Sequence, residues 1–187
     1  LPAQGIGLTP DIDRKFADAA IEFIKQDHEK PYFLHVNFTA PHDPLLMPPG
    51  WEGKYNSKRM PLPKNYQSQH PFDHGNLKGR DELLNSFPRR KSDIKRDLAT
   101  YYAVISHMDQ QIGKILKALD DTDQTKNTIV VFSSDHGLAL GSHGLMGKQN
   151  MYEHTINVPL IFRGPGIPKG KKLAAQCYLR DLYPTFM

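Results

Sequence analysis

Apolar residues recur along the chain in two periodic patterns, which together predict an α/β protein. Helical spacing predicts amphipathic helices over residues 10–28 and 92–119. Short apolar runs rich in β-branched and aromatic residues predict strands at 32–38, 127–133 and 158–162. This order of helices and strands indicates a layered α/β fold, in which helices sandwich a mostly parallel sheet.

Between the first strand and the second helix, over about residues 39–91, neither pattern holds. Eight of the chain's 15 prolines lie there. A long irregular stretch inside a compact domain usually has a functional role. We therefore expect a surface excursion over the carboxyl end of the sheet. Near the end of the chain, Gly164-Pro165-Gly166 predicts a turn, and residues 181–187 predict the first turn of another helix.

Composition sets few further limits. The 187 residues are 39% hydrophobic and 24% charged, as in an ordinary globular domain. The formal charge of +4 comes from scattered basic residues, so a nucleic-acid partner is not expected. No apolar run reaches membrane-spanning length. The single Cys177 excludes an internal disulfide, and we expect it to be a small buried residue.

The clearest candidate site follows the second predicted strand, where Asp135 and His136 precede Gly137. A turn at the glycine would let both side chains reach one ion. Aspartate suits hard cations such as Ca²⁺, whereas histidine is commoner with transition metals. The alternative is that Asp135 caps the turn and His136 is a surface residue.

Three further residues are candidates for contact with an anion. His42 lies between two prolines that restrict its backbone, and it could bind an anion or act as a general acid. Lys148 follows a glycine in a polar loop and suits a tetrahedral oxyanion. His143 could face a substrate or could be purely structural. For His42 and Lys148, a solvated position is the competing interpretation.

Taken in order, several segments resemble the sulfatase family, within the alkaline-phosphatase-like superfamily. The resemblance covers nearly the whole chain and rests on the segments Pro31–Leu34, Pro41–Pro44, Tyr101–Ala103 with Asp109, Asn127–Gly137, Leu140–Lys148, Tyr152-Glu153, Val158–Ile161, Gly164–Gly166 and Asp181–Thr185. Such an ordered set is far more specific than Asp-His-Gly alone.

The resemblance implies a role for each of four residues. Asp135 and His136 would be metal ligands, with Ca²⁺ the usual ion of the family and another divalent cation as the alternative. His42 would contact the sulfate and protonate the leaving oxygen, and Lys148 would hold the sulfate. The substrate class would be a sulfated small molecule or carbohydrate.

The family nucleophile is a formylglycine made from Cys or Ser in a C/S-x-P-x-R motif. Cys177 lacks that context, because Tyr, Leu and Arg follow it. We expect the nucleophile and the family's paired amino-terminal aspartates to lie outside this chain. On this interpretation residues 1–187 are the C-terminal portion of a sulfatase catalytic domain, incomplete at both ends and inactive alone.

Two other functions stay open. One is a phosphatase or phosphonate monoester hydrolase of the same superfamily, and the other is a non-catalytic binding protein with a decayed sulfatase fold. Six residues of the Pro-rich stretch could face a sulfated sugar, although we favour the interpretation that they are solvated or pack locally; these are Trp51, Tyr55, Lys58, Arg59, Arg89 and Arg90. The resemblance implies a periplasmic, extracellular or lysosomal location, and the oligomeric state is not predicted.

Overall fold

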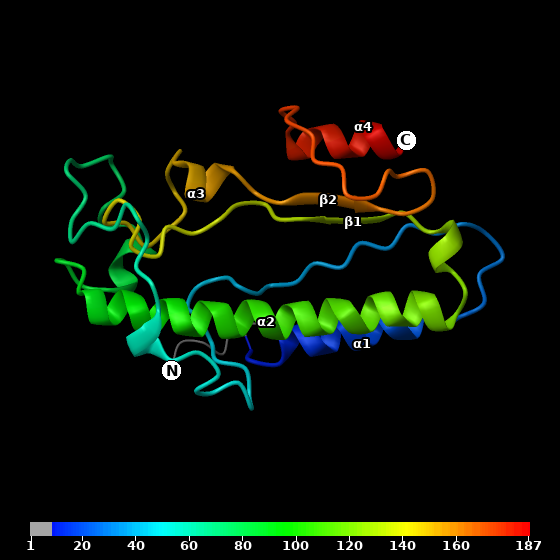
Figure 1. Cartoon of the computed structure of the whole chain (residues 1–187), viewed down its shortest axis with the longest axis horizontal. Coiled ribbons are helices and arrows are strands. Elements are labelled where there is room, and N and C mark those ends of the chain that lie inside the picture. The colour runs from blue at the N-terminus through cyan, green and yellow to red at the C-terminus, as the bar shows by residue number, and fades with distance from the viewer. Residues whose placement is uncertain (1–8) are drawn as a thin grey trace.

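A long helix, α2 (Lys91–Asp121), runs along the molecule and organises the rest of the fold (Figure 1). The computed structural model describes residues 9–187. Helix α1 (Ile12–Ile24) lies against the carboxyl-terminal half of α2, where Ile24 packs with Ala118 and Leu119. Both predicted helices are confirmed, although α1 is shorter than expected.

The early end of α1 has a local cause at His28. Its Nε2 lies 2.9 Å from the carbonyl oxygen of Phe23 in the last turn of the helix. Its ring packs between those of Phe23 and Tyr32, with each pair of centroids 4.6 Å apart. The chain therefore turns away after Ile24 and leads into the extended stretch that follows.

Two strands form the only ladder within residues 9–187. Strand β1 (Val130–Ser133) pairs with β2 (Leu160–Arg163), and Val130 lies opposite Arg163. The ladder is antiparallel, which corrects the pairing expected for these two strands. Strand β1 also begins later than predicted, because a short 3-10 helix takes up Thr125–Asn127.

The first predicted strand, residues 32–38, is extended but joins no ladder with another described residue. Side chains along it alternate between half-buried and exposed, as on a pleated strand. Leu34 and Val130 both pack against the buried cluster that contains Ile24, and Figure 1 shows the stretch between α2 and β1. In Figure 1 it runs in the same direction as β1, as the parallel part of the predicted sheet requires.

The core consists of two groups of buried side chains along α2. One joins the carboxyl-terminal half of α2 to α1 and β1. The other joins the amino-terminal half to the loops, through Ile94, Leu98, Leu140 and Met146. The Pro-rich stretch thus packs against the amino-terminal half of α2. It contains two short 3-10 helices, Ser57–Arg59 and Glu82–Leu84.

Three short helical segments complete the fold: α3 (Glu153–Ile156), a 3-10 helix at Leu179–Asp181, and α4 (Leu182–Phe186). The last confirms the helix predicted at the end of the chain. The ring of Phe186 lies 6.4 Å from that of Phe33 and 6.5 Å from that of Phe162, so α4 covers the strands on the side away from α2 (Figure 1).

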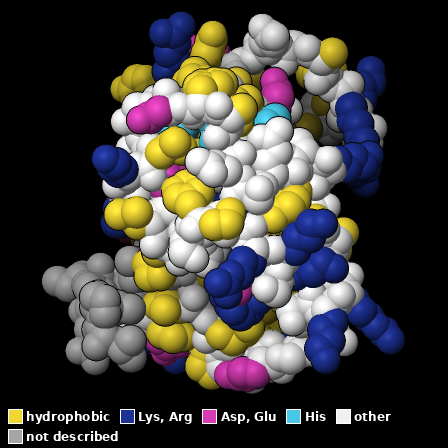
Figure 2. Space-filling model, turned by 90° about the vertical axis from the view of Figure 1, so that its left-hand side faces the viewer, with side chains coloured by type: hydrophobic (Ala, Val, Ile, Leu, Met, Phe, Trp, Pro, Cys, Tyr) yellow, Lys and Arg dark blue, Asp and Glu magenta, His cyan; other side chains and the backbone are white. Residues whose placement is uncertain are grey.

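The surface matches the scattered charge seen in the sequence. Figure 2 looks onto the end of the molecule where the loops gather and shows lysine and arginine side chains spread among apolar ones. None of the helices within residues 9–187 combines the length and apolar character that crossing a membrane requires. Cys177 is exposed, so the expected burial of this residue is wrong.

Candidate active site

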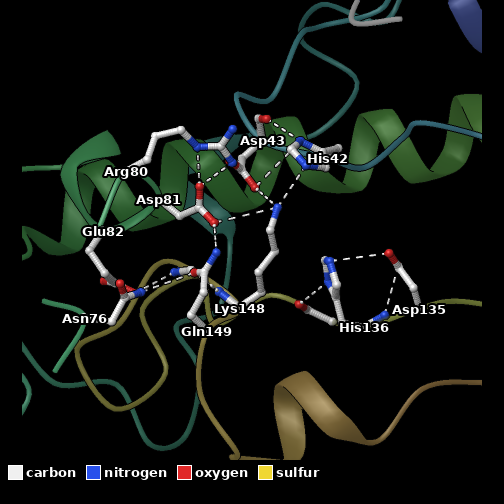
Figure 3. A network of polar contacts seen from close by, with 12 residues as sticks. His42, Asp43, Asn76, Arg80, Asp81, Glu82, Asp135, His136, Lys148 and Gln149 are labelled. Atoms are coloured by element: carbon white, nitrogen blue, oxygen red, sulfur yellow. Dashed lines mark hydrogen bonds and ion pairs between the residues drawn. The ribbon is translucent and has the colours of Figure 1, made fainter. Parts of the chain in front are cut away.

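Four charged side chains form a closed ring of alternating sign at the loop end of the molecule (Figure 3). Lys148 Nζ lies 2.8 Å from Asp43 Oδ1 and 3.7 Å from Asp81 Oδ2. On the opposite oxygens of the same carboxylates, Arg80 donates to Asp43 Oδ2 and, through Nε, to Asp81 Oδ1, each at 2.6 Å. We call these four residues the charge ring.

Three members of the charge ring are almost completely buried, and the fourth, Arg80, is exposed to solvent. The side chains of Asp43, Asp81 and Lys148 are 5%, 1% and 10% exposed, whereas that of Arg80 is 62% exposed. Burial by itself raises the pKa of Asp81. Hydrogen bonds from Gln149 and Arg80, with the charge of Lys148, outweigh it and lower the pKa to about 2. Asp81 is therefore ionised at neutral pH.

His42 extends the ring toward solvent. Its Nε2 lies 3.0 Å from Lys148 Nζ, and its Nδ1 lies 2.5 Å from the carbonyl oxygen of Asp43. A carbonyl oxygen can only accept, so Nδ1 carries the proton and Nε2 accepts from the ammonium. In this arrangement Nε2 is the ring nitrogen that faces Lys148 and the atom that could exchange a proton with a bound group.

A second buried ion pair holds the loop that carries Lys148. The carboxylate of Glu82 accepts from the backbone N–H groups of Met146 at 2.9 Å and Gly147 at 2.8 Å. Arg89, whose side chain is fully buried, donates to Glu82 Oε2 at 2.5 Å and to the carbonyl oxygen of Gly144 at 3.2 Å. The Pro-rich stretch thereby fixes the backbone next to Lys148.

Asp135 and His136 form a separate pair just beyond β1 (Figure 3). His136 Nε2 lies 3.5 Å from Asp135 Oδ2, and the backbone N–H of His136 donates to Asp135 Oδ1 at 2.9 Å. The turn depends on Gly137, because an added Cβ there would lie 2.0 Å from the carbonyl oxygen of His154. The side chains of Asp135 and His136 therefore lie close enough together to contact the same bound ion.

The pair fits part of a metal site. A carboxylate and an imidazole this close together are suitable ligands for one divalent cation, and Asp135 is 81% exposed and available. Within residues 9–187, however, no group of three or more His, Cys, Asp and Glu side chains is arranged to hold a metal. The described residues thus supply two donors.

His143 lies apart from the charge ring. Its ring stacks on Tyr152 at 4.1 Å between centroids and 13° between planes, and its Nε2 lies 2.9 Å from Asn65 Nδ2. The polar contacts of its side chain involve neither Lys148 nor His42. The structure therefore joins two of the three predicted anion-binding residues and places the third in an aromatic cluster.

Sequence reasoning missed Arg80, Asp81 and Gln149, which complete the charge ring and its support. Gln149 donates to Asp81 Oδ2 at 2.8 Å. Arg80 and Asp81 lie in the Pro-rich stretch, where no periodic pattern marks a residue as buried. The one available signal was the run Arg80-Asp81-Glu82 directly before two leucines, because charges next to an apolar pair need partners when they are buried.

A short stretch within this chain also matches the nucleophile pattern, contrary to the expectation that the pattern lies outside it. Ser86-Phe87-Pro88-Arg89-Arg90 fits C/S-x-P-x-R. Ser86 is exposed in the loop before α2, and its side chain makes no hydrogen bond with the charge ring or with any other described residue. The pattern thus occurs in the chain, but the structure does not join Ser86 to His42 or Lys148.

Of the six residues named in the Pro-rich stretch, three pack against neighbouring residues, and Lys58, Arg59 and Arg90 are exposed. Arg89 is buried against Glu82, Tyr55 Oη lies 2.7 Å from Ser106 Oγ, and the Trp51 ring packs edge-on against His107. Arg89 therefore does not face a sugar. Arg80 is the exposed cation that belongs to the charge ring itself.

Comparisons with known proteins identify relatives over most of the chain. A sulfatase of Formosa agariphila is 32% identical over 183 residues, which cover 94% of this chain and 35% of that protein. The chain thus spans about a third of the length of this relative.

Solved structures of related proteins also superpose on most of this chain. The phosphonate monoester hydrolase of Agrobacterium radiobacter superposes with a TM-score of 0.72 at 25% identity, over 84% of this chain and 34% of that one. A protein solved with its substrate D-glucosamine-2-N,6-O-disulfate superposes with a TM-score of 0.62 at 25% identity, over 82% of this chain and 43% of that one. These neighbours confirm the alkaline-phosphatase-like α/β fold. The sequence model of the Sulfatase family matches residues 6–187, and the chain belongs to the sulfatase family.

Proposed function

We propose that this chain forms the part of a sulfate ester hydrolase site that grips the sulfate group. The observation that carries the proposal is the contact of Lys148 Nζ with His42 Nε2 at 3.0 Å, between segments 106 residues apart. An ammonium and an imidazole protonated at the nitrogen that faces it can each donate to one oxygen of a tetrahedral group and stabilise the charge that grows on it.

In this proposal each residue has a distinct task. Lys148 binds a sulfate oxygen. His42, once Nε2 has taken up a proton, would donate that proton to the ester oxygen, which needs one when it leaves. Asp135 and His136 would hold a divalent cation, Ca²⁺ by family resemblance, which would polarise the sulfate oxygens. The nucleophile, a formylglycine by the same resemblance, would come from outside the residues described.

Sulfated carbohydrates are the proposed substrate class. The solved neighbour with D-glucosamine-2-N,6-O-disulfate as its substrate supports this choice. A second candidate is hydrolysis of phosphonate monoesters, which the resemblance to the Agrobacterium radiobacter enzyme favours. Both reactions use a tetrahedral anion that Lys148 and His42 could grip.

A binding experiment tests the proposal on the chain itself. Phenyl sulfate added to the ¹⁵N-labelled chain in calcium buffer should shift the signals of His42 and of the loop around Lys148. Lys148→Gln and His42→Gln should each weaken binding roughly tenfold, because each removes a charge-assisted contact. Lys172→Gln, at an exposed lysine, is the matched control and should change nothing. Shifts that do not depend on Lys148 would overturn the proposal.

A further inference from the structure

The charge ring is electrically balanced before any substrate arrives. It holds two cations, Lys148 and Arg80, and two carboxylates, Asp43 and Asp81, and each cation contacts both carboxylates. The ammonium of Lys148 already lies 2.8 Å from a carboxylate oxygen. An anion that binds Lys148 therefore meets a site with no excess of positive charge.

Both carboxylates are held in place. Asp81 is fixed by Gln149 as well as by Arg80, and its pKa of about 2 keeps it ionised at any pH near neutral. Asp43 is held by Arg80 and Lys148 together. Neither side chain is exposed enough to swing into solvent when an anion approaches. Their negative charge thus acts on whatever binds beside Lys148.

The repulsion between these two carboxylates and a bound anion depends on the charge of that anion. A sulfate ester group carries one negative charge, and so does a phosphonate monoester group. A phosphate monoester carries close to two at neutral pH, because its second pKa is about 6. The second charge is attracted by Lys148 and Arg80 and repelled by both carboxylates, so the balanced ring gives it no net attraction to offset its larger cost of desolvation.

We propose that Asp43 and Asp81 make this site select singly charged tetrahedral esters over doubly charged phosphate monoesters. The inference rests on the proposed function, since it requires that Lys148 contact the charged group of the ester. It makes Asp43 and Asp81 specificity determinants that act without touching the substrate carbon skeleton. It also separates the two candidate reactions above from phosphate monoester hydrolysis.

Two ligands of matched shape test this selection. Phenyl sulfate and phenyl phosphate are titrated into the ¹⁵N-labelled chain at pH 8 in buffer without divalent cations. Phenyl sulfate should bind at least about tenfold more tightly, as expected for one additional unit charge close to a buried carboxylate. At pH 5, where phenyl phosphate carries mainly one charge, its affinity relative to phenyl sulfate should rise severalfold.

Two variants of the charge ring should change the preference for phenyl sulfate over phenyl phosphate in opposite directions. Asp43→Asn removes one negative charge, so the preference for phenyl sulfate at pH 8 should fall roughly tenfold. Arg80→Gln leaves two carboxylates with one cation, so the preference should increase about threefold, less because Arg80 is largely exposed. General damage to the fold would move both variants the same way, and amide spectra report whether each variant is folded.

The outcomes are distinguishable from failure of the proposed function. Equal, Lys148-dependent binding of the two ligands at pH 8 would overturn the selection and leave the sulfate-binding role intact. A preference that stays the same in Asp43→Asn and Arg80→Gln would also overturn it. If neither ligand binds in a Lys148-dependent way, the proposed function fails and this inference fails with it.

Discussion

Asp43 Oδ1 lies 2.8 Å from Lys148 Nζ, although the two residues are 105 positions apart in the chain. Asp43 follows the first extended stretch, and Lys148 lies in the loop after β1. Asp43 lies near the start of the Pro-rich stretch, and Arg80 and Asp81 lie near its end. The candidate site is therefore built from the two ends of this stretch and the Lys148 loop, and its geometry depends on how firmly those loops are held.

Glu82 holds the Lys148 loop in place, because its carboxylate accepts hydrogen bonds from two backbone N–H groups of that loop. Glu82→Ala should lower the free energy of unfolding by about 3–5 kcal/mol, because Arg89 is left as a buried unpaired charge and two backbone N–H groups lose their acceptor. Urea denaturation measures the change. Arg96→Ala breaks the exposed pair with Asp93 and should cost under about 1 kcal/mol. Similar losses in the two variants would contradict this account.

Two glycines should respond to alanine with opposite signs. Gly137→Ala should destabilise the chain by about 1–3 kcal/mol, because the new Cβ would overlap the carbonyl oxygen of His154. Gly113 lies inside α2, where a Cβ meets nothing within 4 Å. Gly113→Ala should stabilise by about 0.5–1 kcal/mol. Thermal unfolding of both variants decides the matter, and a stabilised Gly137→Ala would rule out the close approach.

Acid should weaken the charge ring through Asp81. Its pKa is lowered in the folded chain from 3.8 to about 2, so its contribution is complete above pH 3.8 and is lost as pH falls toward 2. The contribution is on the order of 2 kcal/mol. Asp81→Asn removes this term, so the stability difference between wild type and variant should shrink from pH 5 to pH 2. A difference that is constant over this range would show that Asp81 is not held as an ion.

The 187-residue chain should show no turnover of aryl sulfates. Ser86 has the short motif, but its side chain has no contact with His42 or Lys148, so it cannot supply the nucleophile to that site. An assay with 4-nitrophenyl sulfate in calcium buffer tests activity. Mass spectrometry of the peptide that contains Ser86 should find unmodified serine. Turnover that disappears in Ser86→Ala would refute the placement of the nucleophile outside this chain.

The helices were predictable because their apolar period is long and regular. Ile94 and Leu98 on α2 and Ala17 and Ala20 on α1 are buried as their spacing requires. Strand existence was predictable too, but pairing was not. The antiparallel β1–β2 ladder depends on the path of the loop between them, and the 32–38 stretch has strand alternation without a ladder partner among the described residues.

The candidate site residues differ in how clearly the sequence marks them. Asp135 and His136 were found because a strand end and a glycine mark them, and Gly137 is needed for close approach. His143 has the same kind of Gly-flanked context, yet its ring stacks on Tyr152. Only the positions of neighbouring segments place His42 beside Lys148 and His143 beside an aromatic ring.

The sequence alone determined the elements, the family and the residue types that could grip a sulfate, because period and ordered motifs are local properties of the chain. The tertiary structure decided which charges meet. Asp43, Arg80, Asp81 and Lys148 carry no common sequence signal, and they pair because Glu82 and Arg89 bring the Pro-rich stretch against the Lys148 loop. Charge balance is a property of that three-dimensional ring, so it could only be seen once the loops were placed.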